Sequence, residues 1–498
     1  MSSCFDVEVD LLVIGFGAAG AAAAITASEA GASVMIAEKQ SEHEHTPNTR
    51  MSRGLVMGVN DVERGTDYLV TCAGGMVPAS VLRVFAERAN HVIDWLGEHC
   101  PDVPYTRVTG AEHPEFAGAE AIDAYQAGRA SRKRDPEALV GQHLYASLKR
   151  AVEKTKTQIA WSMPAKRLLR NDGGDVVGAL LGGPEAPCRV SARYGVVLAC
   201  GGFEYDEESK QTYLPAGPMY FYGNPGNTGD GLRLAQDVGA SFWHMGQIVG
   251  RAIGNFTLDS GLAVGFQLGL DSAALGFAQD PAGFFITDRL GNRFANESVQ
   301  AMLMHNFYYD LLQFDSARGI YPRIPCYWFF DERRRCAGPI SSPVVGACAV
   351  GLYDWSLDNM REIERGWIAK GNTPAEVAAA AGMDDPDALA ATFTAYNKAC
   401  AAGRDPLGRQ ETSLIPLDSP PYYCVRLWPG GSNTTGGPRR NERCQILGAF
   451  GAPIRGLYGA GELGQISGLL YAADGANLSE ALCTGQIAAE AALSSHNN

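Results

Sequence analysis

Short apolar runs alternate with longer helical stretches from about residue 7 to about residue 240. Residues 9–14 form the first such run and lead directly into an alanine-rich stretch of helical type. A second strand-like run, residues 33–37, follows that stretch. Strands and helices that alternate in this way are typical of a parallel α/β sheet, which we predict for this part of the chain.

A glycine-rich turn joins the first predicted strand to the first predicted helix. It contains Gly15, Gly17 and Gly20 in the spacing G-x-G-x-x-G. In a dinucleotide site the first glycine allows the tight turn, the second lets the backbone approach a pyrophosphate, and the third allows close packing of helix on strand. The helix N-terminus, at Ala18 and Ala19, offers its N–H groups to the phosphate charge.

Two further segments identify the dinucleotide. Glu38 ends the second strand, where a carboxylate accepts hydrogen bonds from a ribose diol. Near the other end of the chain, residues 455–462 form a strand-like run that ends in Gly461 and Glu462, and a second glycine-rich turn and a helix follow. In flavoproteins such an acid reaches the ribityl chain, and the helix dipole stabilises the reduced ring. The predicted cofactor is therefore FAD.

Several short motifs occur in an order and spacing that resemble one superfamily, nearly from end to end of the chain. This superfamily contains FAD-dependent fumarate reductases, succinate dehydrogenase flavoproteins and 3-ketosteroid dehydrogenases, and the ketosteroid dehydrogenases are the closer branch. Besides the two FAD segments, the motifs lie at residues 48–54, 196–203, 227–231, 291–297 and 433–437.

The resemblance implies an α/β fold with a Rossmann-like FAD-binding domain built from N- and C-terminal segments, residues 1–240 and 426–498. Residues 241–425 are then an inserted α+β cap, or substrate, domain. Within this cap, residues 386–402 are predicted to form a helix that ends at Gly403. The further positions that match cofactor-contacting ones are Lys39, Asn48, Thr49, Ser52, Arg53, Gly54, Ala165, Ala199, Cys200, Gly201, Asn227, Asp230, Gly461, Glu462, Asn477 and Leu478.

Covalent attachment of the flavin is not expected. His45 and Thr46 are similar to the His-Thr pair through which some succinate dehydrogenases bond FAD. Alignment on Gly54, however, places Asn48 at the attachment position. We therefore predict that FAD is bound without a covalent link.

The resemblance implies hydride exchange between a substrate carbon and flavin N5, coupled to proton transfer at the neighbouring carbon. In fumarate reductases a His that starts an H-T-x-G-G motif and an Arg in the C-terminal turn hold the dicarboxylate. Here Asn433 replaces the His, and the turn contains Asp474 and no Arg. Tyr471 and Gly475 instead match the pair that hydrogen-bonds the ketone in 3-ketosteroid dehydrogenases. The alternative is that Tyr471 is a core aromatic that packs on the flavin.

The proton-transfer residue is harder to locate. The tyrosine that ketosteroid dehydrogenases carry after the Asn-Glu dipeptide is absent, because Asn296 and Glu297 are followed by Ser-Val-Gln-Ala. A phenol acts as a base only where its pKa is lowered from about 10. Tyr327 is the leading candidate because it could enter the cleft between cap and flavin domain from a strand. The candidates, each of which could instead be a packing residue, are His305, Tyr308, Tyr309 and Tyr327.

Three arginines have alternative roles. Arg293 lies in a segment that helps to relay protons in fumarate reductases, but an ion pair with Glu297 would instead brace the cap, and we favour the brace. Arg439 and Arg440 follow a Gly-Gly-Pro turn. They could hold an anionic part of a substrate, although charged pairs beside turns are usually solvated.

The composition restricts the kinds of partner and the cellular location that we expect for this protein. The net charge of −14 over 498 residues argues against nucleic acid, which requires a basic face. The 12 cysteines include no C-x-x-C pair, so no iron–sulfur, zinc or haem motif is present and no metal is expected. Unpaired cysteines suit a reducing cytoplasm. No apolar run is long enough to span a membrane, and little precedes the first strand, so we expect a soluble, cytoplasmic protein.

These features predict an FAD-dependent oxidoreductase that acts on CH–CH groups. It would introduce or reduce a C=C bond next to the carbonyl of an apolar, steroid-like ketone, with an electron acceptor or donor that the sequence does not identify. One alternative is a fumarate reductase-like enzyme for an acidic enoate, held by Arg439, Arg440 or a cap arginine. The other is a flavin-binding protein without turnover.

Overall fold

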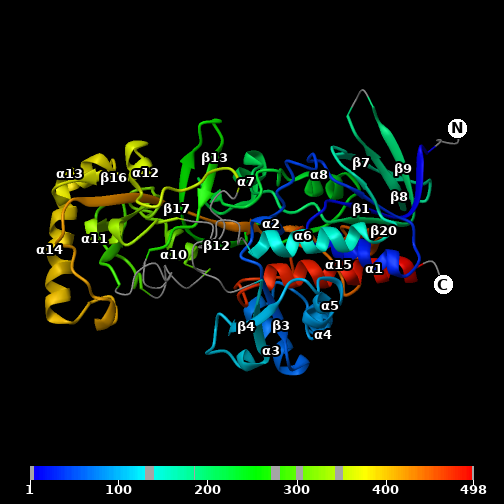
Figure 1. The fold of residues 1–498 in the computed structure, drawn as a ribbon, viewed down its shortest axis with the longest axis horizontal. Helices are drawn as coiled ribbons and strands as arrows, with labels where there is room; N and C mark the ends of the chain where they lie inside the picture. The colour runs from blue at the N-terminus through cyan, green and yellow to red at the C-terminus, as the bar shows by residue number, and fades with distance from the viewer. Residues whose placement is uncertain are drawn as a thin grey trace. The chain divides into compact units, whose positions relative to one another are not determined.

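The structure is a computed structural model that describes residues 5–128, 140–183, 186–270, 281–298, 305, 307–341 and 351–495 (Figure 1). The chain divides into two compact units. Unit 1 contains Met1–Tyr213, Asn224–Ile248 and Asn433–Asn498. Unit 2 contains Leu214–Gly223 and Val249–Ser432.

An eight-stranded sheet forms the centre of unit 1. Its main path runs in the order β19-β20-β9-β1-β2-β6, and β7 and β8 extend it from β9. β1 pairs in parallel with β2 and β9, and β20 pairs in parallel with β9. The C-terminal segment therefore joins the N-terminal sheet, which confirms the predicted Rossmann-like domain. The strands are β1 (Val7–Ile14), β2 (Val34–Ala37), β6 (Gln158–Ala160), β7 (Ala165–Arg170), β8 (Val176–Leu181), β9 (Cys188–Leu198), β19 (Gln445–Leu447) and β20 (Pro453–Gly459).

Helices α1 (Ala18–Glu29) and α15 (Ala476–Ser494) lie side by side against this sheet (Figure 1). Their small residues allow the close approach, because a Cβ atom on Gly485 would stand 2.3 Å from the Ala19 carbonyl oxygen. Unit 1 also contains a three-stranded sheet, β3 (Leu55–Val59), β5 (Ile122–Ala127) and β4 (Tyr105–Gly110). Its other helices are α2 (Asn48–Met51), α3 (Val62–Ala73), α4 (Ala79–Ala89), α5 (Val92–His99), α6 (Val140–Glu153), α7 (Glu207–Tyr213) and α8 (Asp230–Asp237).

Unit 2 contains a seven-stranded sheet and several helices. The main path is β13-β12-β17-β15-β14, and β10 and β16 also pair with β17. The strands are β10 (Tyr220–Phe221), β12 (Ile248–Thr257), β13 (Ala263–Phe266), β14 (Phe284–Thr287), β15 (Cys326–Asp331), β16 (Ala369–Gly371) and β17 (Tyr422–Thr434). The helices are α10 (Tyr308–Leu311), α11 (Glu332–Cys336), α12 (Met360–Glu364), α13 (Pro374–Ala380) and α14 (Pro386–Ala402).

Helix α14 has the bounds that the sequence predicts. The Asp385 side chain accepts a hydrogen bond from the Ala388 N–H at the N-terminus, and Gly403 ends the helix with φ of 62°. Both are preferred capping arrangements. Local sequence signals therefore fix this helix.

The boundaries between the units differ from those expected from the sequence. Residues 214–223 belong to unit 2 and not to the first FAD-binding segment. The reason is that β10 pairs in parallel with Gly430 and Gly431 of β17. Unit 2 otherwise extends from Val249 to Ser432, against the expected 241–425.

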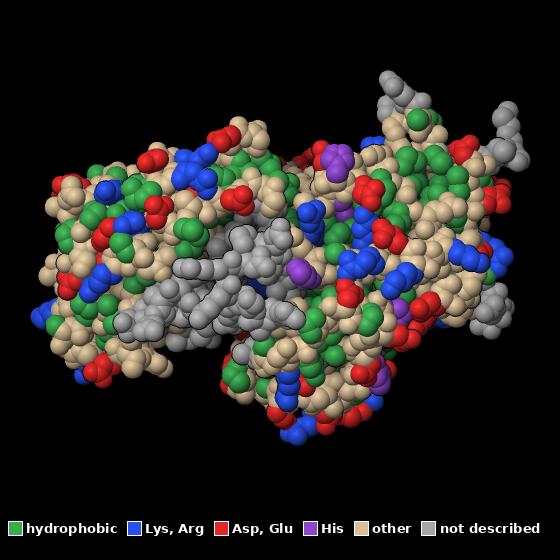
Figure 2. All heavy atoms as spheres, in the orientation of Figure 1, with side chains coloured by type: hydrophobic (Ala, Val, Ile, Leu, Met, Phe, Trp, Pro, Cys, Tyr) green, Lys and Arg blue, Asp and Glu red, His purple; other side chains and the backbone are tan. Residues whose placement is uncertain are grey.

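The described surface and interior add three observations. Acidic and basic side chains are interspersed on the face shown in Figure 2. Across the described part of the chain, no helix combines the length and apolar character needed to cross a membrane, and no group of His, Cys, Asp and Glu is arranged to hold a metal ion. The ten cysteines in that part are all unpaired thiols.

Candidate functional site

The glycine-rich loop after β1 has little room for side chains. Gly15 has φ of 102°, and a Cβ atom there would stand 2.4 Å from the Ala199 carbonyl oxygen. A Cβ atom on Gly20 would stand 2.1 Å from the Gly15 carbonyl oxygen. At Gly17 the nearest protein atom would be Oγ1 of Thr49, at an ordinary contact distance of 3.5 Å. Protein packing therefore requires the first and third glycines, and the second leaves space for a ligand.

The N-terminus of α1 can bind an anion. The Ala18 N–H donates to Thr49 Oγ1 at 2.9 Å, which ties helix α2 to this turn. Among the residues that the structure describes, the N–H groups of Gly17 and Ala19 have no acceptor. Unpaired amides at a helix N-terminus fit the pyrophosphate of FAD.

The Glu38 carboxylate is held at the end of β2 by three neighbours. It is 6% exposed, and its carboxylate accepts hydrogen bonds from the N–H groups of Phe16 (3.0 Å) and Gln40 (2.8 Å). Nε2 of His45 lies 3.3 Å from Oε2, and Nδ1 of His45 lies 2.6 Å from the Tyr145 hydroxyl. Burial opposes ionisation, but the contacts with His45 and the two N–H groups keep the pKa of Glu38 below its ordinary value.

The sequence does not reveal this use of His45, which it suggests only as an attachment point. The imidazole is buried and packs against the rings of Phe16 and Trp161. A Tyr145 O–H that donates to Nδ1 leaves the proton on Nε2, from which it can be donated to Glu38. His45 thus positions the Glu38 carboxylate.

Asn48 connects the two FAD-binding segments. Its Nδ2 donates to both carboxylate oxygens of Glu462, at 3.0 and 2.9 Å, and its Oδ1 accepts from the Asn224 N–H at 2.6 Å. Asn227 Nδ2 reaches the same carboxylate at 3.5 Å. Before Glu462, Gly461 packs close to α1, because a Cβ atom there would stand 3.0 Å from that of Ala19.

A second buried acid, Glu204, belongs to this region and is missed by the sequence reasoning. It is 1% exposed, its Oε1 accepts from the Thr434 N–H at 3.0 Å, and its Oε2 has no hydrogen-bond partner among the described residues. Burial, followed by the nearby charge of Glu462, raises the pKa of Glu204 to about 8. Burial raises the pKa of Glu462 to about 7. Burial therefore raises the pKa values of both acids above the ordinary range of a carboxyl group.

The remaining predicted cofactor residues lie in unit 1, most of them near the carboxyl ends of its parallel strands. Lys39 Nζ forms an ion pair with Asp230 at 2.5 Å, and Cys200 Sγ lies 3.4 Å from the Ile14 carbonyl oxygen. The Met163 N–H donates to the Glu38 carbonyl at 2.8 Å, which brings the segment before Ala165 to the end of β2. Ser52, Gly54, Gly201, Asn477 and Leu478 are buried or half-buried, whereas Arg53 is exposed.

The turn that carries Tyr471 is fixed on both sides. The Leu470 N–H donates to the Cys72 carbonyl at 2.9 Å, and the Tyr68 hydroxyl donates to the Ala472 carbonyl at 2.5 Å. Gly475 has φ of 87°, and a Cβ atom there would stand 2.5 Å from the backbone of Leu55. This position therefore requires glycine.

Tyr471 and Gly475 both lie at the N-terminal end of α15. The Tyr471 hydroxyl accepts a hydrogen bond from the Asn477 N–H at 3.4 Å. Within the described part of the chain, the Gly475 N–H donates to no acceptor. The structure thus brings a hydroxyl and a backbone N–H to the start of one helix.

Arg440, a candidate for anion binding, is buried, and its hydrogen bonds are made within the protein. Its guanidinium donates to the carbonyls of Gly459 (3.0 Å), Gly461 (3.2 Å) and Gly464 (2.9 and 2.5 Å) and to Glu480 Oε1 (2.8 Å). It is 2% exposed. Arg440 therefore clamps the segment that carries Glu462, and it fits neither of the two roles considered from the sequence, anion binding and a solvated surface position.

Tyr327 lies in the core of unit 2. It is 4% exposed, packs among Phe285, Phe329 and Leu389, and donates to the Gly382 carbonyl at 3.4 Å. Burial raises the pKa of Tyr327, which is the opposite of what a phenolate base needs. These surroundings favour a packing role.

The other cap candidates are His305, Tyr308 and Tyr309. Arg251 Nη2 lies 2.9 Å from Nε2 of His305 and 3.2 Å from Nδ1. The Tyr308 and Tyr309 rings pack together with centroids 4.2 Å apart, and burial raises the pKa of Tyr309. Because a guanidinium can only donate, the nitrogen that it contacts on His305 carries a lone pair.

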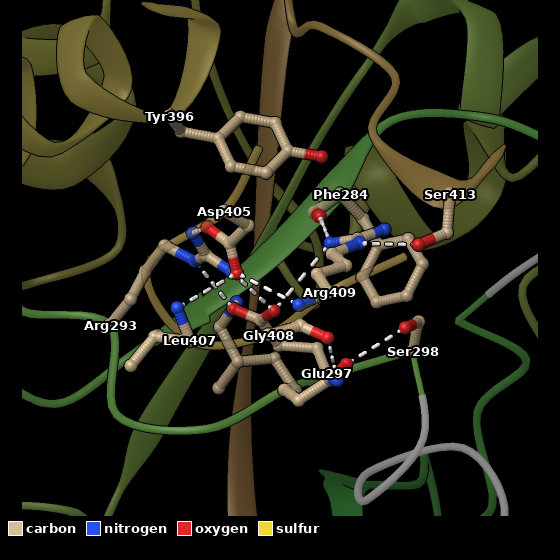
Figure 3. Close-up of polar contacts among 12 residues, drawn as sticks. Phe284, Arg293, Glu297, Ser298, Tyr396, Asp405, Leu407, Gly408, Arg409 and Ser413 are labelled. Carbon is tan, nitrogen blue, oxygen red and sulfur yellow. Dashed lines mark hydrogen bonds and ion pairs between the residues drawn. The ribbon is translucent and has the colours of Figure 1, made fainter. Parts of the chain in front are cut away.

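Arg293 braces unit 2 through a buried network of charges (Figure 3). It donates to both carboxylate oxygens of Glu297 at 2.7 Å and to Asp405 at 2.6 Å, and its guanidinium lies over the Tyr396 ring. Arg409 approaches Glu297 at 3.6 Å. The acids and Arg409 are at most 7% exposed. These contacts support the bracing role over a proton relay.

The sheet, the glycine loop and the acid at the end of β2 define a Rossmann-like dinucleotide-binding protein. The family model for the FAD binding domain matches residues 10–478, so the chain belongs to that family. It is 25% identical to the 3-oxosteroid 1-dehydrogenase of Mycobacterium tuberculosis, over 97% of this chain and 98% of the relative. It is 27% identical to the NADH:fumarate oxidoreductase of Klebsiella pneumoniae, over 91% of this chain and 44% of the relative.

A solved structure has the same fold. The 3-ketosteroid Δ1-dehydrogenase from Sterolibacterium denitrificans, in complex with 1,4-androstadiene-3,17-dione, superposes with a TM-score of 0.81 and 20% identity. The superposition covers 98% of this chain and 100% of the other. The predicted superfamily and its FAD cofactor are thus confirmed, and the chain is an FAD-dependent oxidoreductase of the ketosteroid dehydrogenase and fumarate reductase superfamily.

Replacing Tyr145 by Phe should weaken FAD binding. The change removes the hydroxyl that orients His45 beside Glu38, and a buried hydrogen bond of this kind contributes about 1 kcal/mol, or about fivefold in the dissociation constant. Fluorescence titration of the FAD-free protein with FAD measures it. Tyr105→Phe is the control, since the Tyr105 hydroxyl has no partner among the described residues. Equal affinities for Tyr145→Phe and parent would contradict the role given to His45.

Replacing Glu204 by Gln should make stability less dependent on pH. Folding raises the pKa of Glu204 from 4.5 to about 8, so its favourable contribution is present at low pH and is lost as the pH rises toward 8. Glutamine cannot ionise. The variant's advantage in the free energy of unfolding should grow from about pH 5 to about pH 8, to a few kcal/mol. Denaturant unfolding across this range tests it, and Glu208→Gln on the exposed side of α7 is the control.

Proposed function

We propose that this enzyme introduces or removes a C=C bond next to the carbonyl of an apolar ketone, with steroids as the first substrates to test. The observation that carries the proposal is the position of the Tyr471 hydroxyl and the Gly475 N–H at the start of α15. The relative named 3-oxosteroid 1-dehydrogenase supports this substrate class. Hydride exchange with a substrate carbon is the chemistry that bound FAD supplies.

Tyr471 and Gly475 would act on the ketone oxygen. When the carbon next to a carbonyl loses its proton, negative charge develops on that oxygen. Two fixed donors stabilise the charge, and removal of one donor from such a site costs about 3 to 4 kcal/mol. The turn is held by Cys72, Tyr68 and Leu55, so the donors need little reorganisation.

The same region offers little to a carboxylate. The Arg440 guanidinium is buried and donates to backbone carbonyls and Glu480, and Asn433 stands where fumarate reductases have a His. Asp474 adds negative charge to the turn. The second candidate remains reduction of an acidic enoate, supported by the relative named NADH:fumarate oxidoreductase, with the exposed Arg439 or a cap arginine as the anion-binding group.

A cap residue would exchange the proton at the carbon next to the ketone. We propose His305 in place of Tyr327, because imidazole is a suitable general base near neutral pH, whereas Tyr327 is buried in a core of unit 2. Tyr308 and Tyr309 remain as further candidates. We expect the electron acceptor or donor to be a separate molecule. The unpaired cysteine thiols of the described residues suit a protein that works in a reducing cytoplasm.

FAD would be bound without a covalent link. Asn48, at the position that corresponds to the attachment histidine, is an amide that hydrogen-bonds Glu462 and the Asn224 backbone. His45 is buried between aromatic rings. Neither side chain is available for a bond to the flavin.

Replacing Tyr471 by Phe should lower kcat by about 100-fold to 1,000-fold on the best apolar ketone or enone. The ring that packs in the turn is kept, and one of the two donors to the carbonyl oxygen is deleted. FAD content should be unchanged. Steady-state kinetics with an artificial electron acceptor or donor, and the flavin absorbance of the purified variant, provide the measurement.

The control is Tyr327→Phe, which removes a hydroxyl from the core of unit 2 and should leave kcat within a few-fold of the parent value. Near-parental kcat for Tyr471→Phe would contradict the ketone-binding role and favour the acidic-enoate reading. A large loss in Tyr327→Phe, with normal FAD content, would restore Tyr327 as the base.

A further inference from the structure

Three side-chain amides in unit 1 form a closed ring of hydrogen bonds. Asn477 Nδ2 donates to Asn433 Oδ1 at 2.8 Å, Asn433 Nδ2 donates to Gln465 Oε1 at 3.0 Å, and Gln465 Nε2 donates to Asn477 Oδ1 at 2.5 Å. Within the ring, each amide gives one hydrogen bond and receives one. We call these three residues the amide ring.

The direction of the amide ring is set by the backbone. Asn433 Nδ2 also donates to the Thr434 carbonyl at 3.2 Å, and a carbonyl can only accept. The Asn433 oxygen must therefore face Asn477, which fixes the orientation of Asn477 and then of Gln465. Reversal would place oxygen against oxygen at Thr434. The three hydrogen bonds of the ring can therefore run in only one direction.

The amide ring joins three separate parts of the chain. Asn433 lies in β17, Gln465 lies just after the Gly461–Glu462 turn, and Asn477 is the second residue of α15. Asn433 is 0% exposed and Gln465 1%. Buried amides are costly unless their hydrogen bonds are made, so loss of one member leaves the other two unsatisfied.

The amide ring acts on the Tyr471 hydroxyl through Asn477. The side chain of Asn477 is held by Asn433 and Gln465, and its backbone N–H donates to the Tyr471 oxygen. An oxygen that accepts from this direction must direct its own hydrogen elsewhere, away from the helix. The position of Asn477 therefore decides where the Tyr471 O–H points.

We propose that the amide ring of Asn433, Gln465 and Asn477 is a positioning device that aims the Tyr471 O–H at the substrate carbonyl. This inference rests on the proposed function, because it requires Tyr471 to donate to the substrate. It also gives a reason for Asn433 in place of histidine: a neutral amide closes the ring without adding a cation. None of the three residues needs to touch the substrate.

A double-mutant cycle tests the coupling between the amide ring and Tyr471. Asn433→Leu keeps a similar side-chain size and breaks the ring. It should lower kcat on the ketone by about 10-fold to 100-fold, with smaller changes in KM and FAD content. In the Tyr471→Phe background the same change should cost less than about twofold, because the hydroxyl that the ring positions is absent.

The two claims fail in different ways. If Asn433→Leu lowers kcat by the same factor with and without the Tyr471 hydroxyl, the positioning role is wrong while the proposed function stands. Unchanged kcat in Asn433→Leu leads to the same conclusion. If Tyr471→Phe alone is as active as the parent, the proposed function fails and the positioning role fails with it.

The variant Gln465→Glu provides a second test, which distinguishes a positioning role of the amide ring from a purely structural one. A carboxylate at this position can accept from Asn433 but cannot donate to Asn477 or to the neighbouring carboxyl group of Glu480, whereas the protonated acid restores the donor. The ratio of variant to parent kcat should therefore rise at least fivefold as the pH falls through the pKa of the new carboxyl group. Flavin absorbance at each pH verifies that FAD is retained.

Gln158→Glu is the matched control, because Gln158 is exposed in β6 of the same unit. Its kcat ratio to the parent should stay constant with pH. A constant ratio for Gln465→Glu as well would overturn the proposal.

Discussion

The parallel pairing of β20 with β9 is the interaction on which the rest of unit 1 depends. Leu457, Tyr458 and Gly459 pair with Val196, Val197 and Leu198, so two segments separated by more than half of the chain end at the same edge of one sheet. Both strands carry their functional residues just beyond that edge. The pairing thus places Glu462 beside Asn227 and Asn48, and Gly461 against α1.

Hydrogen bonds among buried polar groups then hold the side chains at this edge of the sheet in fixed positions. Glu38 is fixed by His45 and backbone amides, Glu462 by Asn48, and Asn477 by the amide ring. Each of these groups would be costly in isolation, because an unsatisfied buried donor or acceptor loses about 1 to 3 kcal/mol. Because their hydrogen bonds are made, these side chains are held in one arrangement. The requirement for complete hydrogen bonding explains why distant parts of the sequence share this region.

Local signals made much of the fold and the cofactor site predictable. The glycine fingerprint, Glu38 and the caps of α14 depend on neighbours along the chain, and the sequence alone indicates them. Glu204, Tyr145 and Gln465 could not be found in this way, because each has a hydrogen-bond partner that lies more than 30 residues away. Tyr327 shows the converse: its strand was expected to lead into a cleft, but its side chain packs in a core formed by α13 and α14.

The central claim is that the substrate is a neutral, apolar carbonyl compound. Anaerobic mixing of the purified enzyme with saturated steroid ketones, enones and enoates, followed by flavin absorbance, tests it most directly. We expect saturated ketones to bleach the oxidised flavin, or enones to restore the colour of the reduced flavin, while enoates do neither. A flavin that responds only to acidic enoates would contradict the account.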